Sequence, residues 1–490
     1  MADLYKINKN DNVAVALKDL KKGTAENGMI LKDDIPFGHK VLLCDLPAGS
    51  EIIKYSNRIG YLKKNCYAGE HIHSHNLKTA LNSENIVYTA PNTFHEYNPL
   101  KTYDSFLGYD RGDLGVGIRN EIWIIPTVGC VNKLCEKIKE NSKSVVSDAV
   151  TDVKIFSHPY GCSQMGEDSR MTSKILASLV SHPNAAGVLV VSLGCENNNL
   201  ENFKPLLGDY DENRVKFLVA QNEEDEISKG VSIIKELSSF AETFEKKEIS
   251  ADRLVVGLKC GGSDAFSGIT ANALCGQFTD KITSFGASAV LTEVPEMFGA
   301  ETILLNRAMD ISVFNQAADL INSFKNYFES RNQVCYENPS PGNKEGGITT
   351  LEEKSLGCIQ KGGQATVTGV IPYAGKCKSS GLNLLYSPGN DIVSTTALTA
   401  AGAHLVLFTT GRGTPLGAPV PTIKIASNTP LFERKKKWID FNAGTMIDNS
   451  NGDECEKLYS LVLETASGKK TKNEENGYFE FAVLKDGVTM

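Results

Sequence analysis

The sequence predicts a multidomain α/β protein in which a small N-terminal β-domain precedes mainly parallel α/β sheet domains. The chain has 490 residues, which is more than one hydrophobic core usually holds. Residues 12–78 contain short β-segments separated by Gly, Pro and Asp turns. From residue 108 onward, apolar strands alternate with longer amphipathic segments, and this alternation is typical of a parallel sheet covered by helices.

These changes of pattern divide the chain into four segments. Residues 1–78 are expected to form the β-domain. Residues 79–107 are polar, contain scattered Pro and Asn and show little periodicity, so they predict a linker or an arm wrapped over another domain. We expect an α/β catalytic domain over residues 108–336. The loop ENPSPGNKEGG at 337–347 marks the next boundary, and residues 337–490 are expected to form a C-terminal α/β domain.

Composition excludes several classes of partner. The formal charge of -8 argues against a nucleic-acid-binding surface. The N-terminal residues lack the apolar core of a signal peptide, and the longest strongly apolar stretch, AAGVLVVSL, is shorter than the ~20 residues of a spanning helix. We therefore expect a cytoplasmic protein without a membrane partner. Its 12 cysteines are then reduced thiols, metal ligands or buried small residues.

Four candidate strands end beside a cysteine and a glycine. If the strands share one sheet, these thiols meet at its ligand-binding edge, where four thiolates could hold an iron–sulfur cluster or a closed zinc site. The spacings match no C-x-x-C signature, and a buried cysteine is usually a small hydrophobic residue, so the structural alternative stays open. The four thiols are Cys130, Cys162, Cys195 and Cys260.

The segment GLKCGGSDAFSGITAN, residues 257–272, is suited to an anionic ligand. Glycine lets backbone N–H groups approach a ligand oxygen, and a following helix would direct its positive end at a carboxylate or phosphate. A tight packing turn is the alternative. Lys259 could pair with the anion or, if burial lowered its pKa, abstract a proton. The residues that would bind the anion are Gly261, Gly262, Ser263 and Asp264.

Two further segments carry charged candidates at strand ends. In TEVPEMFGAE, residues 292–301, Glu293 lies nearest the strand end and could ligate a divalent cation or act as acid or base. A first helical turn rich in Glu is the alternative. In TTGRGTPLG, residues 409–417, Arg412 could grip a carboxylate with two hydrogen bonds or be a surface arginine. The loop lacks the spacing of a nucleotide-binding motif.

The stretch GEHIHSHN, residues 69–76, places histidines at every second position. Alternate residues of a strand share one face, with Cα atoms ~6.5 to 7 Å apart. At most two of the three side chains should therefore bind one metal directly. An exposed polar strand face is the alternative. The three histidines are His71, His73 and His75.

In order along the chain, ten segments resemble the altronate dehydratase family, which also includes galactarate dehydratase and sulfolactate sulfo-lyase. Among them are DNVAVALKDL, GEHIHSHN, GVGIRNEIWIIPTVGCVN, HPYGCSQMGED, LKCGGSDAFSGITAN, VLTEVPEMFGAE and LVLFTTGRGTP. The likeness extends from about residue 10 to the C-terminal KDGVTM. It implies an N-terminal β-clip domain of the SAF type and dependence on a divalent metal, Fe(2+) or Mn(2+).

The resemblance also implies a hydro-lyase that converts D-altronate to 2-dehydro-3-deoxy-D-gluconate and water in hexuronate breakdown. A base would take the proton at C2 and an acid would assist departure of the C3 hydroxyl. The doubly charged enediolate must be neutralised by a cation and by nearby Lys or Arg.

The segments offer residues for each of these roles. We predict His73 and His75 as metal ligands, with Glu293 or the strand-end thiols as further candidates. Lys259 and His158, which lies in FSHPYGC, are the candidate base and acid. The residues that could hold the substrate are Arg412, Gly261, Gly262, Ser263 and Asp264.

Alternatives remain at the level of chemistry. The substrate could be galactarate or sulfolactate, or the enzyme could use an iron–sulfur cluster on the strand-end thiols. A sugar-acid or metal-binding protein without turnover is the alternative outside enzymes. Because the histidines and Lys259 belong to different segments, we expect the two surfaces to meet, within one chain or across a homodimer.

Overall fold

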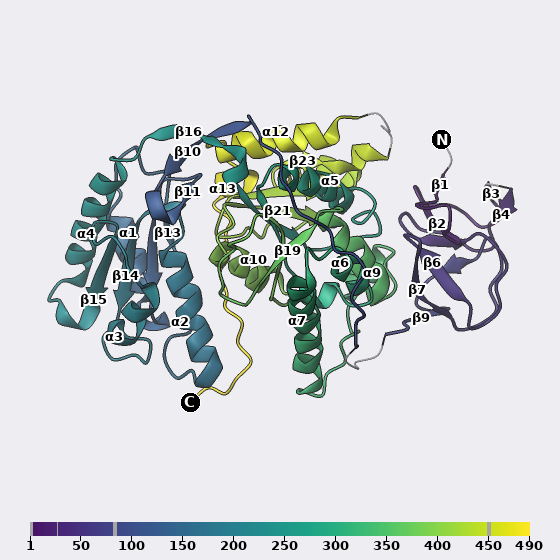
Figure 1. Ribbon diagram of the computed structural model, residues 1–490, viewed down its shortest axis with the longest axis horizontal. Coiled ribbons are helices and arrows are strands. Elements are labelled where there is room, and N and C mark those ends of the chain that lie inside the picture. Colours follow the sequence, from purple (N-terminus) through teal and green to yellow (C-terminus); the bar gives the residue numbers. More distant parts are fainter. Residues whose placement is uncertain (1–2, 27, 82–85, 448–451) are drawn as a thin grey trace.

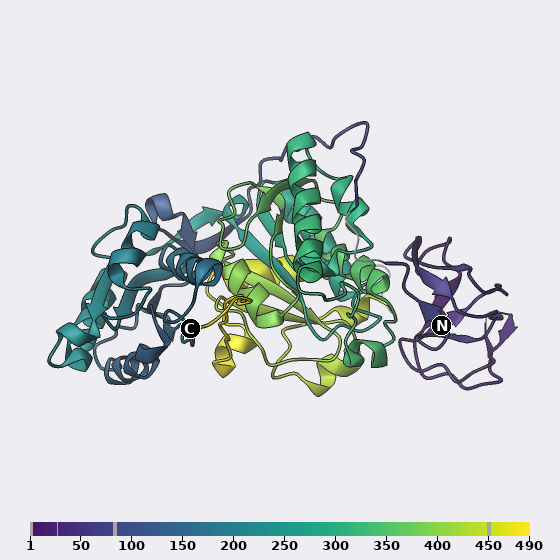
Figure 2. The same ribbon diagram turned by 90° about the horizontal axis from the view of Figure 1, so that it is seen from below.

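The computed structural model describes residues 3–26, 28–81, 86–447 and 452–490. Three bodies lie in a row (Figure 1). The N-terminal β-domain is at one end, an α/β domain with a four-stranded sheet is at the other, and a larger α/β domain lies between them. The view from below shows the same order (Figure 2). The predicted fold class, a small β-domain followed by parallel α/β sheets, is confirmed.

The β-domain consists of small antiparallel sheets. One has the order β1-β2-β5-β8 and another the order β6-β7-β9, with a separate β3-β4 pair. Apolar side chains such as Val13, Ile52 and Leu62 fill its interior. The strands are β1 (Leu4–Tyr5), β2 (Val13–Ala16), β3 (Ala25–Glu26), β4 (Met29–Ile30), β5 (Lys40–Leu42), β6 (Glu51–Lys54), β7 (Asn57–Leu62), β8 (His71–Ile72) and β9 (Leu77–Lys78).

A segment without helix or regular strand, residues 86–104, runs along the central domain and is held by polar contacts. The Tyr88 hydroxyl donates to Glu301 at 2.9 Å and the Tyr97 hydroxyl to the Thr283 carbonyl at 2.8 Å. The chain then enters a three-stranded antiparallel sheet of order β11-β10-β16. Its strands are β10 (Ser105–Asp110), β11 (Val116–Gly117) and β16 (Lys246–Ser250).

The four-stranded sheet is fully parallel, in the order β13-β12-β14-β15. Its central strand β14 is buried along its whole length, as expected where helices cover both faces. The strands are β12 (Glu121–Pro126), β13 (Val153–Ile155), β14 (Ala185–Ser192) and β15 (Val215–Val219). The helices are α1 (Asn132–Asn141), α2 (Gly166–Val180), α3 (Leu200–Phe203) and α4 (Glu226–Ala241).

The central domain is built on a seven-stranded sheet of order β19-β20-β18-β17-β21-β22-β23, in which all pairs are parallel. Its strands are β17 (Val255–Cys260), β18 (Ser288–Leu291), β19 (Val367–Ile371), β20 (Gly381–Leu385), β21 (Leu405–Thr410), β22 (Thr422–Ala426) and β23 (Phe441–Asn442). Strands from both sides of residue 337 share this sheet. The boundary predicted between residues 336 and 337 is therefore wrong, because backbone hydrogen bonds of β17 and β18 to later strands unite the two segments.

Helices of the central domain include α5 (Ala271–Ser284), α6 (Glu301–Leu305), α7 (Ile311–Glu329), α8 (Pro341–Glu345) and α9 (Leu351–Cys358). The remaining ones are α10 (Asp391–Ala400), α11 (Thr429–Arg434), α12 (Glu454–Ala466) and α13 (Lys472–Asn476). The longest, α7, begins where the Asp310 side chain accepts from the Val313 N–H at 2.8 Å. No helix within the described ranges is long and apolar enough to cross a membrane.

A buried group of three charges joins the β-domain to α9. Glu353 accepts from Lys40 Nζ at 2.9 Å and from Lys54 Nζ at 2.8 Å, and all three side chains are at most 1% exposed. Lys40 Nζ also donates to the Gly347 carbonyl at 2.7 Å and to Thr349 Oγ1 at 2.9 Å. The β-domain is therefore fixed to the same helix that ends at Cys358.

Candidate active site

The carboxyl end of β17 places Lys259 at the centre of a buried charged group. Its Nζ donates to Glu293 Oε1 and to the Cys260 carbonyl, and it lies 2.9 Å from Asp391 Oδ1. Burial alone would lower the pKa of Lys259, but the Asp391 and Glu293 carboxylates raise it above its ordinary value. Lys259 is thus an ammonium at neutral pH. The Asp391 side chain is 33% exposed and connects the group to solvent.

Glu293 meets a second ammonium on its other oxygen. Its Oε2 accepts from Lys361 Nζ at 3.2 Å and from the Cys260 N–H at 3.1 Å. Burial raises the pKa of Glu293 to about 7, against the lowering effect of Lys259 and Lys361. Its φ of 70° lies in the left-handed region, a strained conformation for a residue other than glycine and one found often at functional sites. Glu293 can therefore exchange a proton near neutral pH.

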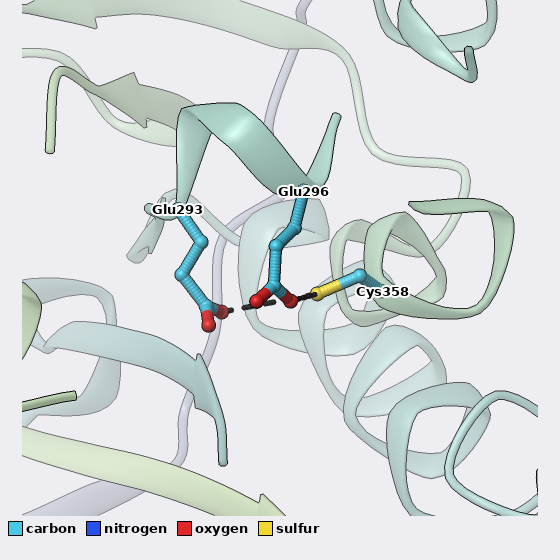
Figure 3. Close-up of side chains that lie close together, drawn as sticks. All are labelled: Glu293, Glu296 and Cys358. Carbon is cyan, nitrogen blue, oxygen red and sulfur yellow. Dashed lines mark hydrogen bonds between the residues drawn. The ribbon is translucent and has the colours of Figure 1, made fainter. Parts of the chain in front are cut away.

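Glu296 and Cys358 extend this group (Figure 3). Glu293 and Glu296 come from the short helix η6 (Val294–Glu296) and the residue before it, and they face the thiol at the end of α9. The Cys358 thiol donates to Glu296 Oε2 at 3.0 Å, and Lys354 Nζ donates to Oε1 at 2.8 Å. Burial would raise the pKa of Glu296, but Lys354 and the other lysines lower it to about 2. Glu296 is therefore a carboxylate.

Cys260 and Cys358 behave as one coupled thiol pair. The nearby Cys358 thiol lowers the pKa of Cys260, and the nearby Cys260 raises the pKa of Cys358. Lys361 Nζ lies 2.8 Å from Cys358 Sγ, and Ser263 Oγ lies 2.7 Å from Cys260 Sγ. Cys260 is therefore the more acidic thiol of the two, and the Lys361 ammonium lies beside the pair.

A divalent cation does not fit this charged group as arranged. Glu293, Glu296 and Cys358 offer ligand atoms within 4.8 Å of one another, the one such trio in the described part of the chain. However, their oxygens already accept from ammonium, thiol or backbone N–H donors, and Lys259, Lys354 and Lys361 supply three positive charges. A cation would have to displace these donors. The group is therefore a set of buried ion pairs.

The turn after β17 joins two loops at the sheet edge. Gly262 has a φ of 63°, and its carbonyl accepts from the N–H groups of Gly411 and Arg412 at 3.1 and 3.0 Å. A Cβ added to Gly261 would lie 2.6 Å from the Phe408 ring. The two glycines predicted to hold a carboxylate thus position the backbone that carries Arg412.

Ser263 and Asp264, also predicted to bind substrate, are buried and bound within the protein. Asp264 Oδ1 accepts from the Ser267 and Ser427 hydroxyls at 2.9 and 2.8 Å. Its Oδ2 accepts from Asn428 Nδ2 at 2.9 Å. This carboxylate is therefore saturated by donors, and it holds the loop after β17 to the loop after β22 at the sheet edge.

A cavity of about 380 Å³ lies between the β-domain and this edge, within the range of roughly 300 to 1,000 Å³ typical of small-molecule sites. Phe37 and Gly38 of the β-domain line one side, and Arg412 and Arg434 line the other. Arg412 is 44% exposed and pairs with Glu345 at 2.9 Å. Because an exposed pair contributes little, its guanidinium can exchange Glu345 for a substrate carboxylate.

The β-domain presents four histidines to the central domain, with neighbouring ring centroids 5.0 to 5.5 Å apart: His39, His71, His73 and His75. His39 Nε2 donates to the Glu345 carbonyl at 3.1 Å, and His73 Nε2 to the Lys344 carbonyl at 3.0 Å. A carbonyl only accepts, so His39 Nδ1 must in turn accept from His71 Nε2 at 2.9 Å. These bonds join the histidines to α8 of the central domain within one chain, and no hydrogen bond among the described residues joins them to Lys259 or Glu293.

Two of these histidines keep ring nitrogens free. Within the described residues, neither His71 Nδ1 nor His75 has a hydrogen-bond partner, whereas His73 Nδ1 lies 3.0 Å from Ser74 Oγ. Burial lowers the pKa of His71 to about 3 and that of His73 to about 4, so both rings are neutral at neutral pH. The histidine group has free ring nitrogens, but no three of its nitrogens lie within 4.8 Å of one another. Glu293 does not join it.

The structure does not bring His158 to Lys259. His158 follows β13 in the four-stranded sheet, where its Nε2 donates to the Pro126 carbonyl at 2.8 Å. Its Nδ1 accepts from the Tyr160 N–H at 3.1 Å. Both ring nitrogens are occupied by backbone groups of the same domain, so the prediction of His158 as an acid or base beside Lys259 is wrong.

The four strand-end cysteines do not form one group either. Cys130, Cys162 and Cys195 follow strands of the four-stranded sheet and are exposed, whereas Cys260 is the last residue of β17 in the other sheet and is buried. The convergence of all four thiols depended on their strands sharing one sheet, and that condition is not met, because the strands belong to two different sheets.

Sequence reasoning missed Lys354, Cys358 and Lys361. Their spacing of four and three residues places them on one face of a helical turn, and this was the available signal. Asp391, at the start of α10, had no comparable signal. Glu296 was visible three residues after Glu293, but a Glu-rich first turn explained it equally well.

Family models match three consecutive parts of the chain. The altronate/galactarate dehydratase SAF domain matches residues 2–80. The D-galactarate dehydratase/altronate hydrolase second domain matches residues 108–242. The D-galactarate/altronate dehydratase C-terminal model matches residues 251–489. These ranges follow the three bodies of the fold.

Curated relatives match over the full length. The chain is 47% identical to altronate dehydratase of Bacillus subtilis, covering 100% of both chains. It is 46% identical to altronate dehydratase of Escherichia coli, covering 99% of both. Galactarate dehydratase (L-threo-forming) of Escherichia coli is 33% identical, with 95% of this chain and 93% of that one covered. The protein is therefore an enzyme of the altronate and galactarate dehydratase family of hydro-lyases.

Proposed function

We propose that this enzyme dehydrates D-altronate to 2-dehydro-3-deoxy-D-gluconate, and that the reaction takes place at the lysine and glutamate group around Glu293. The relatives that are 47% and 46% identical to this chain act, by their names, on altronate. The observation that carries the proposal is the position of Glu293, whose two oxygens accept from the ammonium groups of Lys259 and Lys361.

This geometry suits removal of a proton beside a carboxylate. Such a proton is very weakly acidic, so its loss needs a base and fixed positive charge where the enediolate forms. Lys259 and Lys361 are fully buried and already oriented by Glu293, so they need no reorganisation during the reaction. The raised pKa of Lys259 makes it a stabilising cation in place of the base that its position in the sequence first indicated.

Glu293 is the group best placed to accept the C2 proton. Its pKa of about 7 leaves a substantial fraction ionised at neutral pH, as efficient base catalysis requires. The electrons of the C2–H bond then form the C2–C3 double bond as the C3–O bond breaks. The departing hydroxyl takes a proton from Cys358, whose raised pKa keeps it a thiol, and leaves as water. The enol becomes the ketone.

The substrate would first dock by its carboxylate in the cavity beside Arg412, before it reaches the lysine and glutamate group. The guanidinium offers two parallel hydrogen bonds to a carboxylate, and Arg434 adds a second positive charge to the same cavity. Asp391, which is partly exposed, lies on the way from solvent to Lys259.

The family resemblance implies Fe(2+) or Mn(2+), and the histidine group is the part of the site that fits such an ion. His71 and His75 would supply two imidazole nitrogens, since three ring nitrogens of the group do not lie within 4.8 Å of one another. A bound ion would supply Lewis acidity beside the cavity. His39 would orient His71 through the ring-to-ring hydrogen bond.

We further propose that the enzyme works in the cytoplasm as a homodimer. All twelve cysteines are free, which suits a reducing compartment. Light scattering on the eluting protein would measure its mass, and a monomer at assay concentration would contradict the dimer.

The test is turnover of a panel of sugar acids. Purified enzyme is incubated with altronate, galactarate or sulfolactate, with Fe(2+), Mn(2+) or chelator, and 2-keto acid is detected with semicarbazide. We expect keto acid from altronate and much less from the others. Turnover of galactarate without turnover of altronate would overturn the substrate assignment, and binding of altronate without product would overturn the enzymatic one.

A further inference from the structure

Three cysteines gather at the carboxyl edge of the four-stranded sheet, which the proposed mechanism does not use. Cys162, Cys130 and Cys195 follow the neighbouring parallel strands β13, β12 and β14. Carboxyl ends of parallel strands meet at one edge of a sheet, and neighbouring strands lie about 4.8 Å apart. The three thiols, called here the three-thiol edge, therefore belong to one small surface.

The thiols of this edge face solvent. Cys130, Cys162 and Cys195 are exposed, in contrast to six cysteines that are buried elsewhere in the chain. A structural cysteine is normally a buried small residue, so packing does not explain three exposed ones at neighbouring strand ends. N–H and O–H groups point at two of the sulfurs. Gln221 Nε2 lies 3.4 Å from Cys195 Sγ and Ser163 Oγ lies 3.9 Å from Cys162 Sγ.

Buried hydrogen bonds hold the loops of this edge against one another. Glu196 Oε1 accepts from the hydroxyls of Thr127 and Ser192 at 2.5 and 2.6 Å, and its Oε2 accepts from the Gly194 N–H at 2.7 Å. Asn198 Nδ2 donates to the Thr127 carbonyl at 3.1 Å, and the Asn198 N–H to the Gly161 carbonyl at 3.0 Å. The loops after all three strands are thereby fixed relative to one another.

The glycine before each cysteine lets these loops approach closely. A Cβ at Gly161, where φ is 97°, would lie 2.0 Å from the Thr127 carbonyl oxygen. One at Gly129 would lie 2.7 Å from the His158 carbonyl oxygen. Gly194, with a φ of 123°, would meet Gln221 Oε1 at 2.9 Å. The Gly-Cys pairs thus build a rigid surface that displays thiols, and the His158 ring bonded to this backbone helps to position it.

The end of the chain also lies at this edge. The Met490 N–H donates to the Ser163 carbonyl at 2.9 Å, and Thr489 pairs with Gln164. In Figure 1 the C-terminus lies at the end of α2 that follows Cys162, on the side of the molecule away from the β-domain. The three-thiol edge is thus separate from the histidine group and the cavity beside Arg412.

We propose that Cys130, Cys162 and Cys195 hold an iron–sulfur cluster of the [4Fe–4S] type, leaving one iron without a protein ligand. Such clusters take cysteine thiolates as ligands, and three thiolates serve three of the four irons. The fourth iron faces solvent and can take an oxygen ligand, such as water, hydroxide or a carboxylate of a small molecule.

The spacing favours a cluster over a single ion. One zinc ion bonds each thiolate at about 2.3 Å, which draws all its sulfur ligands close together. The three sulfur atoms here are not all within 4.8 Å of one another. A cluster spans a wider opening because each thiolate binds a different iron.

The first test is spectroscopic, so its outcome does not depend on which substrate the enzyme turns over. The full-length protein is purified without oxygen, supplied with Fe(2+) and sulfide, and desalted. We expect a brown protein with broad visible absorption that retains iron and acid-labile sulfide. Each of Cys130→Ser, Cys162→Ser and Cys195→Ser should lower the retained sulfide by about tenfold or more, since changes even to outer partners of metal ligands weaken binding 10- to 100-fold.

Two control variants separate this site from others. Cys44→Ser removes an exposed thiol of the β-domain and should leave the spectrum unchanged. His71→Ala removes a candidate ligand of the histidine group and should also leave it unchanged. A colourless wild-type protein without sulfide, one bound zinc ion, or a spectrum that survives all three cysteine substitutions would each overturn the proposal.

A second measurement avoids variants that could fold poorly. Wild-type protein with and without the cluster is treated with iodoacetamide under anaerobic conditions, and the modified cysteines are identified by mass spectrometry. We expect these three thiols to be protected only in the loaded protein, while Cys44 reacts in both. Equal labelling of the three thiols in both samples would contradict the assignment.

Discussion

The carboxyl edges of the two parallel sheets carry the same sequence pattern in different surroundings. At the seven-stranded sheet, Cys260 is buried beside Lys259 and Glu293, and the β-domain is fixed over this side of the central domain. At the four-stranded sheet, Cys130 and Cys162 are exposed. A cysteine and glycine at a strand end therefore determine the shape of the loop, whereas the covering elements determine ionisation and access.

The largest effect on activity should come from removing the carboxylate of Glu293 at the edge of the seven-stranded sheet. Glu293→Gln removes the proposed base but keeps the shape of the side chain. We expect kcat for altronate to fall by about 10²- to 10⁴-fold, the usual contribution of a general base. Initial rates with saturating substrate would measure this fall.

A matched control is Glu301→Gln. Glu301 is a buried glutamate that pairs with Lys325 at 3.1 Å, outside the proposed reaction centre. Thermal unfolding would show similar destabilisation of both variants. If both lost activity equally, the loss would reflect folding, and Glu293 would have no special role.

The next largest effect should come from weakening the attachment of the β-domain to the central domain. Glu353→Gln leaves Lys40 and Lys54 buried without a countercharge, and breaking a buried pair in this way costs about 3 to 5 kcal/mol. We expect the apparent free energy of unfolding to fall by this amount and proteases to release the β-domain more readily. Glu433→Gln, which breaks an exposed pair with Lys436, should cost less than about 1 kcal/mol. Equal effects of the two substitutions would show that the buried ion pairs of Glu353 do not hold the β-domain in place.

Acid should weaken the same buried ion pairs between the β-domain and α9. Burial would raise the pKa of Glu353, but Lys40 and Lys54 lower it to about 2 from 4.5. A depressed carboxyl pKa gives stability that is present above the unfolded value and is lost as pH falls from about 4.5 towards 2. We expect release of the β-domain, followed by limited pepsin digestion, to rise across this window. In Glu353→Gln the pH dependence should be weaker, and an identical profile would exclude this carboxyl as its cause.

A smaller effect is expected at the rim of the covered edge. Arg412→Met should raise KM for altronate by about 10- to 100-fold, the value of a hydrogen-bonded charge pair, with little change in kcat or in thermal stability. Arg434→Met, in the same cavity, is the comparison and should raise KM less. A fall in kcat at constant KM would show that Arg412 does not hold the substrate carboxylate.

The smallest effect concerns thiol access in metal-free protein. Iodoacetamide should label Cys130, Cys162 and Cys195 well before the buried Cys260 and Cys358, because alkylation needs solvent contact. Mass spectrometry of timed samples would measure the order. Equal rates at both edges would remove the contrast between them.

The sequence predicted the strands and their ends better than it predicted their partners. The apolar runs before Cys130, Cys195 and Cys260 are strands, as expected, because burial of β-structure is a local property of the residue pattern. Strand order is a property of distant segments. The pattern could not reveal that Cys260 belongs to a second sheet, or that the Gly/Pro-rich loop at 337–347 lies within one domain.

The candidate site shows the same limit. Lys259 and Glu293 were predicted because each lies at a strand end. Lys361 reaches Glu293 from 68 positions away, and only the fold brings the two together. His158 was misassigned because a histidine beside a strand end can equally hold backbone groups, and its two backbone hydrogen bonds are not visible in the pattern.

The buried charges at Lys40, Lys54 and Glu353 have a consequence for the chain as a covalent unit. If the polypeptide were cut after residue 80, one fragment would carry two ammonium groups and the other a carboxylate, each newly hydrated. Reassociation would have to strip that water again, so the charges would add little affinity. They would instead reject any other neutral or basic surface. The peptide connection therefore keeps the β-domain bound to the central domain, and the buried charges make this contact selective for the correct surface.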